Sequence, residues 1–433
     1  MNEKILAIWL SKALGPGSIY AKRLLEEYGS FENIYRLSPL EYEHIGIKRN
    51  STIMARLSDK NTDHAYKSAA FCDQNHFGIV EYTSHVYPQR LRVIKDPPPV
   101  LFTRGRMIDI DDNVCLAVVG TRSYSDAGWN STYKIASGLA SGGAVVVTGL
   151  ASGIDTAATR AALDSSGFAI GVIGSGIEKI YPLENKELFE EMYQKGLVIT
   201  ERVPFAEITG SYFPVRNRII SGISNAVLVG EGSTKSGAMI TAGHASEQGR
   251  HIYAIPADIS NPESTGVNNL IRDGAYPVFD SWDILKNYTY LYPHRITGIS
   301  ASQITEVPEK RSTKRIRVIK GSSSVADGKV QPSTEHQSTI SKESAIAKKK
   351  EDEIHKQHNA NSKAKIAMPD FGLDSLNPTE RKIYDCIASN GSMVADTISE
   401  HTGIHPIDVN IALTILEMSG LVETEGAKVR IKQ

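Results

Sequence analysis

Cysteine and excess charge of either sign are both scarce in this sequence. The chain has 3 cysteines in 433 residues, Cys72, Cys115 and Cys386, and no two of them form a C-x-x-C pair. The sequence therefore indicates neither a disulfide framework nor a cysteine-based zinc site. The formal net charge of -1 argues against a uniformly basic nucleic-acid-binding protein. Any binding of a polyanion has to depend on a local patch.

Long apolar runs are also missing. Near the N-terminus the run Ile5 to Leu10 is too short for the apolar segment of a secretory signal, and no stretch approaches the length of a membrane span. We therefore expect a soluble, cytoplasmic protein that does not contact a membrane.

The motifs of common nucleotide-binding enzymes are absent as well. No G-x-G-x-x-G follows the first predicted strand, and the pair Lys235-Ser236 has no preceding glycine of a P-loop. No spacing selects Asp155, Glu201 or His244 as a nucleophile, base or metal ligand. We predict no cofactor, no metal site and no catalytic residue, and interpret Asp155 as capping or bracing its helix.

Apolar, β-branched runs alternate with helical patterns in the middle of the chain. The predicted strands are Leu116 to Val119, Val145 to Thr148, Ala169 to Ile173, Leu197 to Thr200, Ala226 to Val229 and Ile252 to Ile255. The predicted helices between them are Asp126 to Ser141, Ile154 to Ser165, Asn185 to Gln194, Arg218 to Ile223 and Ala238 to Gln248. Strands that are apolar on both faces belong to a parallel sheet covered on both sides. We predict an α/β fold with a Rossmann-like, doubly wound, mostly parallel sheet of about six strands or more.

The length predicts several domains. We expect a helical domain of the helix-hairpin-helix or SAM-like kind over residues 1–85, the Rossmann-like domain over 86–295, a linker over 296–372 and a winged-helix domain over 373–433. In the helical domain the turn Gly15-Pro16-Gly17 fits two interpretations, a turn that offers backbone N–H groups to a phosphate and an ordinary helix connector.

The predicted linker is basic and poor in apolar residues. Residues 308–366 contain no aromatic residue, and 14 Lys and Arg stand against 7 Asp and Glu. Such a stretch cannot bury enough apolar surface to fold, so we predict a disordered segment that either attracts DNA or serves only as a tether. In the winged-helix domain the expected recognition helix, Pro406 to Ser419, has no Lys or Arg. This favours an accessory or protein-binding role over major-groove reading.

Glycine-rich turns follow the predicted strands. They are Gly120 to Ser123, Gly149 to Asp155, Gly174 to Gly176 and Gly230 to Gly232, the last leading to Ser236-Gly237. Because ligands of such sheets bind beyond the carboxyl ends of the strands, these turns predict an anion site at one edge. Arg216 and Arg218 in Phe213 to Ser224 are predicted to lie just ahead of a helix start, where two guanidiniums favour a phosphate chain. Salt bridges are the alternative for both arginines.

Six ordered blocks carry a family resemblance. They are GTRSYSDAG (120–128), TGLASGIDTAA (148–158), GSGIEKIYPLENKEL (174–188), FPVRNRIISGIS (213–224), SGAMITAGHASEQGR (236–250) and GVNNLIRDGA (266–275). This succession resembles the DNA-processing protein A family, also called DprA or Smf. The resemblance implies a non-enzymatic protein that binds and protects single-stranded DNA without reading its sequence, in natural transformation and homologous recombination, and helps load the recombinase RecA. It also leads us to expect a homodimer.

The same resemblance, together with the predicted turns, assigns the DNA-phosphate contacts. The expected site residues are Arg122, Arg216, Arg218, Lys179, Lys186, Gly120, Gly149, Gly153, Gly174, Gly176, Ser236 and Gly237. The chain departs from the family pattern at Thr121 and Thr159, and residues 201–212 lack a Tyr-Pro-Pro-Gly pattern. The alternative is a nucleotide-binding sensor or phosphoribohydrolase-like enzyme on the same sheet, although the signature P-G-G-x-G-T-x-x-E is absent. A transcription regulator using the winged helix is a third possibility.

Overall fold

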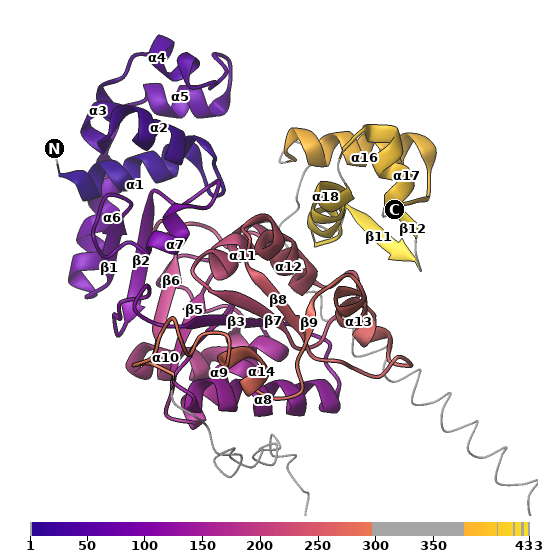
Figure 1. The fold of residues 1–433 in the computed structure, drawn as a ribbon. Helices are drawn as coiled ribbons and strands as arrows, with labels where there is room; N and C mark the ends of the chain where they lie inside the picture. Colours follow the sequence, from indigo (N-terminus) through magenta and orange to yellow (C-terminus); the bar gives the residue numbers. More distant parts are fainter. Residues whose placement is uncertain (1, 297–375, 405, 419–420, 426–427, 432–433) are drawn as a thin grey trace, which may run out of the picture. The chain divides into compact units, whose positions relative to one another are not determined.

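The computed structural model describes residues 2–296, 376–404, 406–418, 421–425 and 428–431 (Figure 1). The predicted linker thus lies almost wholly outside the described residues. The N-terminal region is helical, as α1 (Glu3–Leu14), α2 (Tyr20–Tyr28), α3 (Phe31–Arg36), α4 (Pro39–His44), α5 (Thr52–Ser58) and α6 (Asp63–Gln74). No helix in the described part of the chain is both long and apolar enough to cross a membrane.

A nine-stranded sheet follows, in the order β1-β2-β6-β5-β4-β3-β7-β8-β9. Its strands are β1 (Gly78–Glu81), β2 (Val100–Gly105), β3 (Cys115–Val119), β4 (Val145–Thr148), β5 (Phe168–Val172), β6 (Leu197–Thr200), β7 (Ala226–Val229), β8 (His251–Ala254) and β9 (Tyr276–Pro277). The strands from β6 to β9 are mutually parallel, whereas β2 pairs antiparallel with both β6 and β1. The predicted fold class is confirmed.

Helices cover both faces of this sheet. They are α7 (Gln89–Arg92), α8 (Asp126–Ser141), α9 (Ile154–Asp164), α10 (Lys186–Lys195), α11 (Tyr212–Gly222), α12 (Gly237–Glu247), α13 (Thr265–Arg272) and α14 (Trp282–Leu285), with 3-10 turns η1 (Leu183–Asn185) and η2 (Pro262–Ser264). Helices α8, α9, α10 and α14 lie along one face, and α11, α12 and α13 along the other (Figure 1). Each face has its own apolar cluster, and the cluster beneath α8 and α9 continues into the N-terminal helices.

The six predicted strands are present, with bounds shifted by no more than one residue. Three further strands were not predicted, because β1 and β2 pair antiparallel at one edge and β9 has only two residues. Strand β1 belongs to the sheet, although residues 78–81 were predicted to belong to the helical domain. Helix α11 starts at Tyr212 and not near Arg218, so Arg216 and Arg218 lie inside a helix and not ahead of one.

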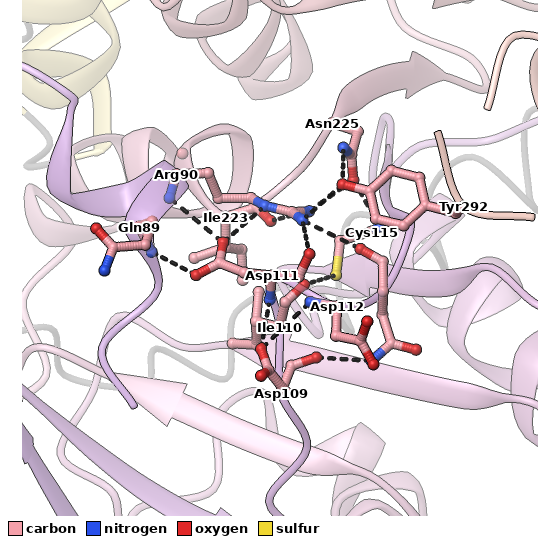
Figure 2. A network of polar contacts seen from close by, with 12 residues as sticks. Gln89, Arg90, Asp109, Ile110, Asp111, Asp112, Cys115, Ile223, Asn225 and Tyr292 are labelled. Atoms are coloured by element: carbon pink, nitrogen blue, oxygen red, sulfur yellow. Dashed lines mark hydrogen bonds and ion pairs between the residues drawn. The ribbon is translucent and has the colours of Figure 1, made fainter. Parts of the chain in front are cut away.

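A buried arginine organises the amino edge of the sheet (Figure 2). Arg90 of α7 donates from Nη1 to Asn225 Oδ1 at 2.6 Å and from Nη2 to the Tyr292 hydroxyl at 3.1 Å, and its Nε lies 3.2 Å from Asp111 Oδ1. The backbone carbonyls of Asp111, Asn113 and Ile223 accept further hydrogen bonds from it. Because Asn225 also accepts from the N–H of Cys115, this network fixes the starts of β3 and β7.

The C-terminal region has the arrangement of a winged helix. It comprises α16 (Pro378–Asn390), β10 (Met393–Val394), α17 (Ala395–Thr402), α18 (Pro406–Met418), β11 (Val422–Glu425) and β12 (Lys428–Ile431). Asn377 and Glu380 form a capping box at the start of α16. The three strands pair antiparallel in the order β10-β12-β11 and enclose a small apolar core with the helices.

Candidate functional site

The glycine-rich turns meet at the carboxyl edge of the sheet, beside the point where the strand order reverses at β3 and β7. A cavity of about 220 Å³ lies there, which we call the arginine cavity. Its lining residues are Arg122, Gly149, Ala151, Ser152, Tyr181, Pro182, Glu184, Phe213 and Arg216. A second hollow next to it shares Arg122 and Arg216 and is also lined by Gly120, Ser236 and Gly237. The structure therefore brings six of the twelve predicted site residues to one place.

Two guanidiniums of like charge face this cavity. Arg122 is exposed, whereas Arg216 is 5% exposed and donates from Nη1 to the carbonyls of Gly149, at 2.9 Å, and Val172. Burial lowers the pKa of Arg216 to about 10, Asp155 opposes this shift, and Arg122 adds to it. Arg216 therefore stays positive at neutral pH, and an anion in the cavity relieves the repulsion between the two guanidiniums.

Asp155 occupies part of the predicted anion site. Its carboxylate accepts hydrogen bonds from the N–H groups of Gly120, at 3.3 Å, and Gly149, at 2.8 Å. These two N–H groups are therefore committed to the protein itself, and both glycines shape the cavity without donating to a ligand. Asp155 was expected to cap or brace its own helix, but its carboxylate instead holds the turns after β3 and β4 together, and the start of α9 has no side-chain cap. Its buried carboxylate has a raised pKa because burial outweighs the opposing effect of Arg216.

Arg218 does not reach the cavity. It is 2% exposed and its guanidinium binds the carboxylates of Asp96, at 3.1 Å, and Glu201, at 2.7 Å. Two residues apart on a helix means about 200° of rotation, so Arg216 and Arg218 face opposite sides of α11. The salt-bridge interpretation, which the sequence left open for both arginines, is correct for Arg218. Its assignment as a phosphate contact does not fit this geometry.

An aromatic pair beside the arginines was missing from the predicted site. The rings of Tyr181 and Phe213 stack at 5.1 Å between centroids and both line the arginine cavity. Gly174 leaves room for this pair, since a Cβ at Gly174 would lie 2.8 Å from the Phe213 ring. The signal was present in the quoted YPLEN and FPVRNR blocks, where an aromatic residue flanks a proline in each.

The other predicted residues have separate surroundings. Gly153 begins α9 with a φ of 86°, a conformation that favours glycine. A Cβ at Gly176 would contact the Glu178 carboxylate. Lys179 donates to the carbonyl of Ala206 at 2.6 Å, and the exposed Lys186 lies 3.8 Å from Glu190. None of these four residues lines the arginine cavity.

Two carboxylates limit where an anion can bind. Glu231, after β7, accepts from the N–H and hydroxyl of Ser125 at 2.8 and 2.7 Å, so it occupies the N-terminus of α8. Glu184 lines the arginine cavity and accepts a hydrogen bond from Ser152. The positive part of the site is therefore confined to the surroundings of Arg122, Arg216 and the start of α12 at Ser236.

Comparisons with known proteins identify the family. The family model for DNA recombination-mediator protein A matches residues 78–289, and the model for the DprA winged helix domain matches residues 369–428. Protein Smf of Synechocystis is 34% identical over 292 residues, which are 64% of this chain and 71% of that protein. The chain belongs to the DprA/Smf family.

Two further DprA comparisons agree with this assignment. The DNA processing protein DprA of Streptococcus pneumoniae is 39% identical over 228 residues, which are 53% of this chain and 79% of that protein. The X-ray structure of the DprA from the same species gives a TM-score of 0.58 at 35% identity, covering 66% of this chain and 98% of that chain. The DprA/Smf resemblance predicted from the six sequence blocks is thus confirmed.

Proposed function

We propose that this protein binds single-stranded DNA at the arginine cavity and acts as a recombination mediator in DNA uptake and homologous recombination. The observation that supports this most is the placement of Arg122 and Arg216 beside the stacked Tyr181 and Phe213. Arginines bind phosphate oxygens whatever the sequence, and an aromatic face accepts any base. Membership of a family described as DNA recombination-mediator proteins supports the same role.

Within this proposal the predicted residues differ in role. Arg122 and Arg216 contact phosphates, Tyr181 stacks a base, and Ser236 and Gly237 offer the start of α12. Gly120, Gly149, Gly153, Gly174 and Gly176 shape the turns, and Lys179 and Lys186 contribute only to the surrounding field. Arg218 stabilises the fold. The four predicted domains stay a proposal, with the helical domain ending before β1.

The direct test is the anisotropy of a labelled single-stranded oligonucleotide, with a duplex competitor and a salt series. We expect Arg122→Gln to weaken binding roughly tenfold and to reduce the slope of log affinity against log salt by about one. Arg36→Gln, which removes an exposed arginine of the helical region, serves as the matched control. A parent that does not prefer single strands, or an Arg122→Gln variant that equals the control, overturns the proposal.

No catalytic step is part of this function. We propose that the protein acts on DNA by binding alone, and that a nucleotide-hydrolysing or phosphoribohydrolase-like activity on the same sheet is absent. The test is incubation with nucleoside phosphates and single strands, followed by chromatography of the products. Turnover that Arg122→Gln abolishes would favour the enzyme.

Partners follow from the mediator role. We propose that the strand-bound protein promotes assembly of RecA, which a strand-exchange or filament-assembly measurement tests.

We also propose a homodimer through the sheet edge at β9, where Tyr276, Phe279 and Trp282 are 54%, 74% and 42% exposed. Light scattering of the parent and of Phe279→Lys tests the dimer, since the variant is expected to be monomeric.

A further inference from the structure

A larger cavity lies between the helical region and the loop that follows β6. Its volume is about 420 Å³, and we call it the interdomain cavity. Its lining residues are Trp9, Ser11, Lys12, Ala13, Gly15, Pro16, Arg56, Asp59, Asn61, His64, Glu201, Arg202, Val203, Phe205, Ala206 and Tyr212. It shares no lining residue with the arginine cavity. A volume in this range accommodates a ligand of about nucleotide size.

Packing between the two regions holds this cavity in shape. Lys22 of α2 donates to the carbonyls of Val93 and Ile94 at 3.1 and 3.3 Å. The turn Gly15 to Gly17 rests on α11, because a Cβ at Gly17 would lie 2.8 Å from the Val215 side chain. At Gly15 the space within 4 Å of such a Cβ is open, so this part of the turn can be approached closely by a ligand.

The charge in the interdomain cavity is positive. Lys12, Arg56 and Arg202 line it, and none of these three side chains takes part in an ion pair with a carboxylate of the described residues. Of the two acidic residues in the lining, Glu201 has both carboxylate oxygens bound by Arg218, at 2.8 and 2.7 Å. Asp59 accepts from the N–H of Asn61 and is the single remaining opposing charge among the described lining residues.

Arg202 is held in place with a donor unused. Its guanidinium stacks 3.7 Å from the centre of the Tyr212 ring, and Nη2 donates to the Glu207 carbonyl at 3.3 Å. The Nε atom is buried and has no acceptor among the residues that the structure describes. The buried Nε itself is covered, so the part of Arg202 that can contact a ligand is the rest of the guanidinium.

An exposed aromatic residue with a strained backbone conformation, Phe205, also lines the interdomain cavity. Phe205 has a φ of 68°, which is unusual for a residue other than glycine, and the residue is 53% exposed. Its N–H donates to Glu178 at 2.9 Å and its ring lies 4.6 Å from Phe71, which fixes this conformation. With about half of the residue exposed, part of Phe205 is accessible to a base.

We propose that the interdomain cavity binds a nucleoside phosphate, with the phosphate between Lys12, Arg56 and Arg202. The base stacks on Phe205. The ligand is either a free mononucleotide or one nucleotide of a bound single strand, because both present the same phosphate and base. This site is additional to the proposed strand site at the arginine cavity.

The test is calorimetric titration of the full-length chain with deoxyadenosine monophosphate, in an Arg122→Gln background that weakens the other site. Adding Lys12→Gln and Arg56→Gln is expected to reduce nucleotide affinity roughly tenfold or more, since two charged contacts are lost. The matched control adds Lys4→Gln and Lys48→Gln, which remove two exposed lysines of the same region outside the cavity lining. Thermal unfolding of each variant checks that the fold is kept.

A third variant tests the base contact. Phe205→Ala is expected to lower the affinity for deoxyadenosine monophosphate roughly tenfold while binding of inorganic phosphate stays the same, since only the nucleotide loses a stacked base. The proposal is overturned if the Arg122→Gln protein binds no mononucleotide, or if the Lys12 and Arg56 variant equals its control.

Oligonucleotide anisotropy then identifies the source of the ligand, with Arg122 intact. If Lys12→Gln with Arg56→Gln weakens strand binding and flattens its salt dependence, the cavity holds a nucleotide of the strand. If mononucleotide binding is lost and strand affinity is unchanged, the ligand is a free nucleotide. Failure of the parent to bind single strands would overturn only the proposed function, because the mononucleotide titration does not depend on it.

Discussion

At the amino edge of the sheet Arg90 is surrounded by acceptors, whereas at the carboxyl edge Arg216 is not. The Arg90 side chain is 9% exposed and donates to three side chains and three carbonyls (Figure 2). Arg216 is 5% exposed, and its Nη2 donates to no residue that the structure describes. Two arginines whose side chains are both largely buried can thus differ, because only one retains a donor for a ligand. Whether all N–H donors of the guanidinium already have acceptors within the protein, and not how deeply it is buried, distinguishes a structural arginine from one that can bind a ligand.

Arg218 sharpens this comparison, because it lies on the same helix as Arg216 but resembles Arg90. Arg218→Met leaves the carboxylates of Asp96 and Glu201 buried without a cation, so we expect the free energy of unfolding to fall by about 3–5 kcal/mol. Urea denaturation followed by circular dichroism measures this loss. The exposed pair of Arg36 and Glu32 provides a control, since Arg36→Met is expected to cost less than about 1 kcal/mol. A stable Arg218→Met variant that fails to bind DNA would contradict the assignment.

Arg90→Met tests the amino edge directly. The change removes the donors for the carbonyls of Asp111, Asn113 and Ile223, and we expect a loss of about 2–4 kcal/mol in the free energy of unfolding. Arg90→Lys should recover little, because an ammonium cannot reproduce the planar set of donors. Oligonucleotide affinity of the folded variant should match that of the parent. Unchanged stability with weakened binding would reverse the comparison.

Gly149→Ala tests the carboxyl edge without removing an arginine. The added Cβ would lie 2.7 Å from Arg216 Nη2 and 2.8 Å from Asp155 Oδ2, so the guanidinium must shift. We expect roughly tenfold weaker oligonucleotide binding and a stability loss of about 1–2 kcal/mol. At Gly243, inside α12, a Cβ has no atom within 4 Å, so Gly243→Ala should be neutral or stabilising by up to about 1 kcal/mol. Equal binding by the parent and Gly149→Ala would show that the position of Nη2 is unimportant.

The last prediction concerns the pH dependence of stability and His244, which lies on α12. Burial lowers the pKa of His244 to about 4, against a smaller opposing effect of Glu247. Between pH 6.5 and 4 the unfolded chain binds a proton that the folded chain does not, so this residue makes stability fall as pH falls through that window. Relative to His244→Gln, the parent should lose up to about 2 kcal/mol more between pH 7 and 5. Denaturation curves at both pH values measure the difference, and parallel pH dependence in the two proteins would contradict the pKa shift.

The sequence predicted the middle of the sheet well because strands such as β3, β4 and β7 are buried on both faces and read as short apolar runs. It could not predict β9, which has two exposed residues, or the antiparallel pairing of β1 and β2. These elements form at the sheet edges through long-range pairing that leaves little local pattern.

The candidate site was predicted in composition but not in detail. Arg122, Arg216 and the glycines were found because each follows a strand or belongs to a quoted block. Arg218 was misassigned because α11 was expected to start too late, and only the helical rotation between positions 216 and 218 separates their roles. Two further features could not be predicted because they depend on contacts between distant segments. Lys179 donates to the carbonyl of Ala206, and Asp155 accepts from the N–H groups of Gly120 and Gly149.

The buried group of Arg218, Asp96 and Glu201 has an evolutionary consequence. Removing one member leaves a buried charge without its partner, whereas replacing all three by apolar residues of similar volume can be neutral or stabilising. Relatives of this protein should therefore either keep the whole trio or lose it together. Arg216 has no carboxylate within ion-pair distance among the described residues and donates to the carbonyls of Gly149 and Val172, so its substitution is not coupled to that of an acidic partner. The residues at positions 216 and 218 should therefore vary independently of each other among relatives, although both lie on a single turn of one helix.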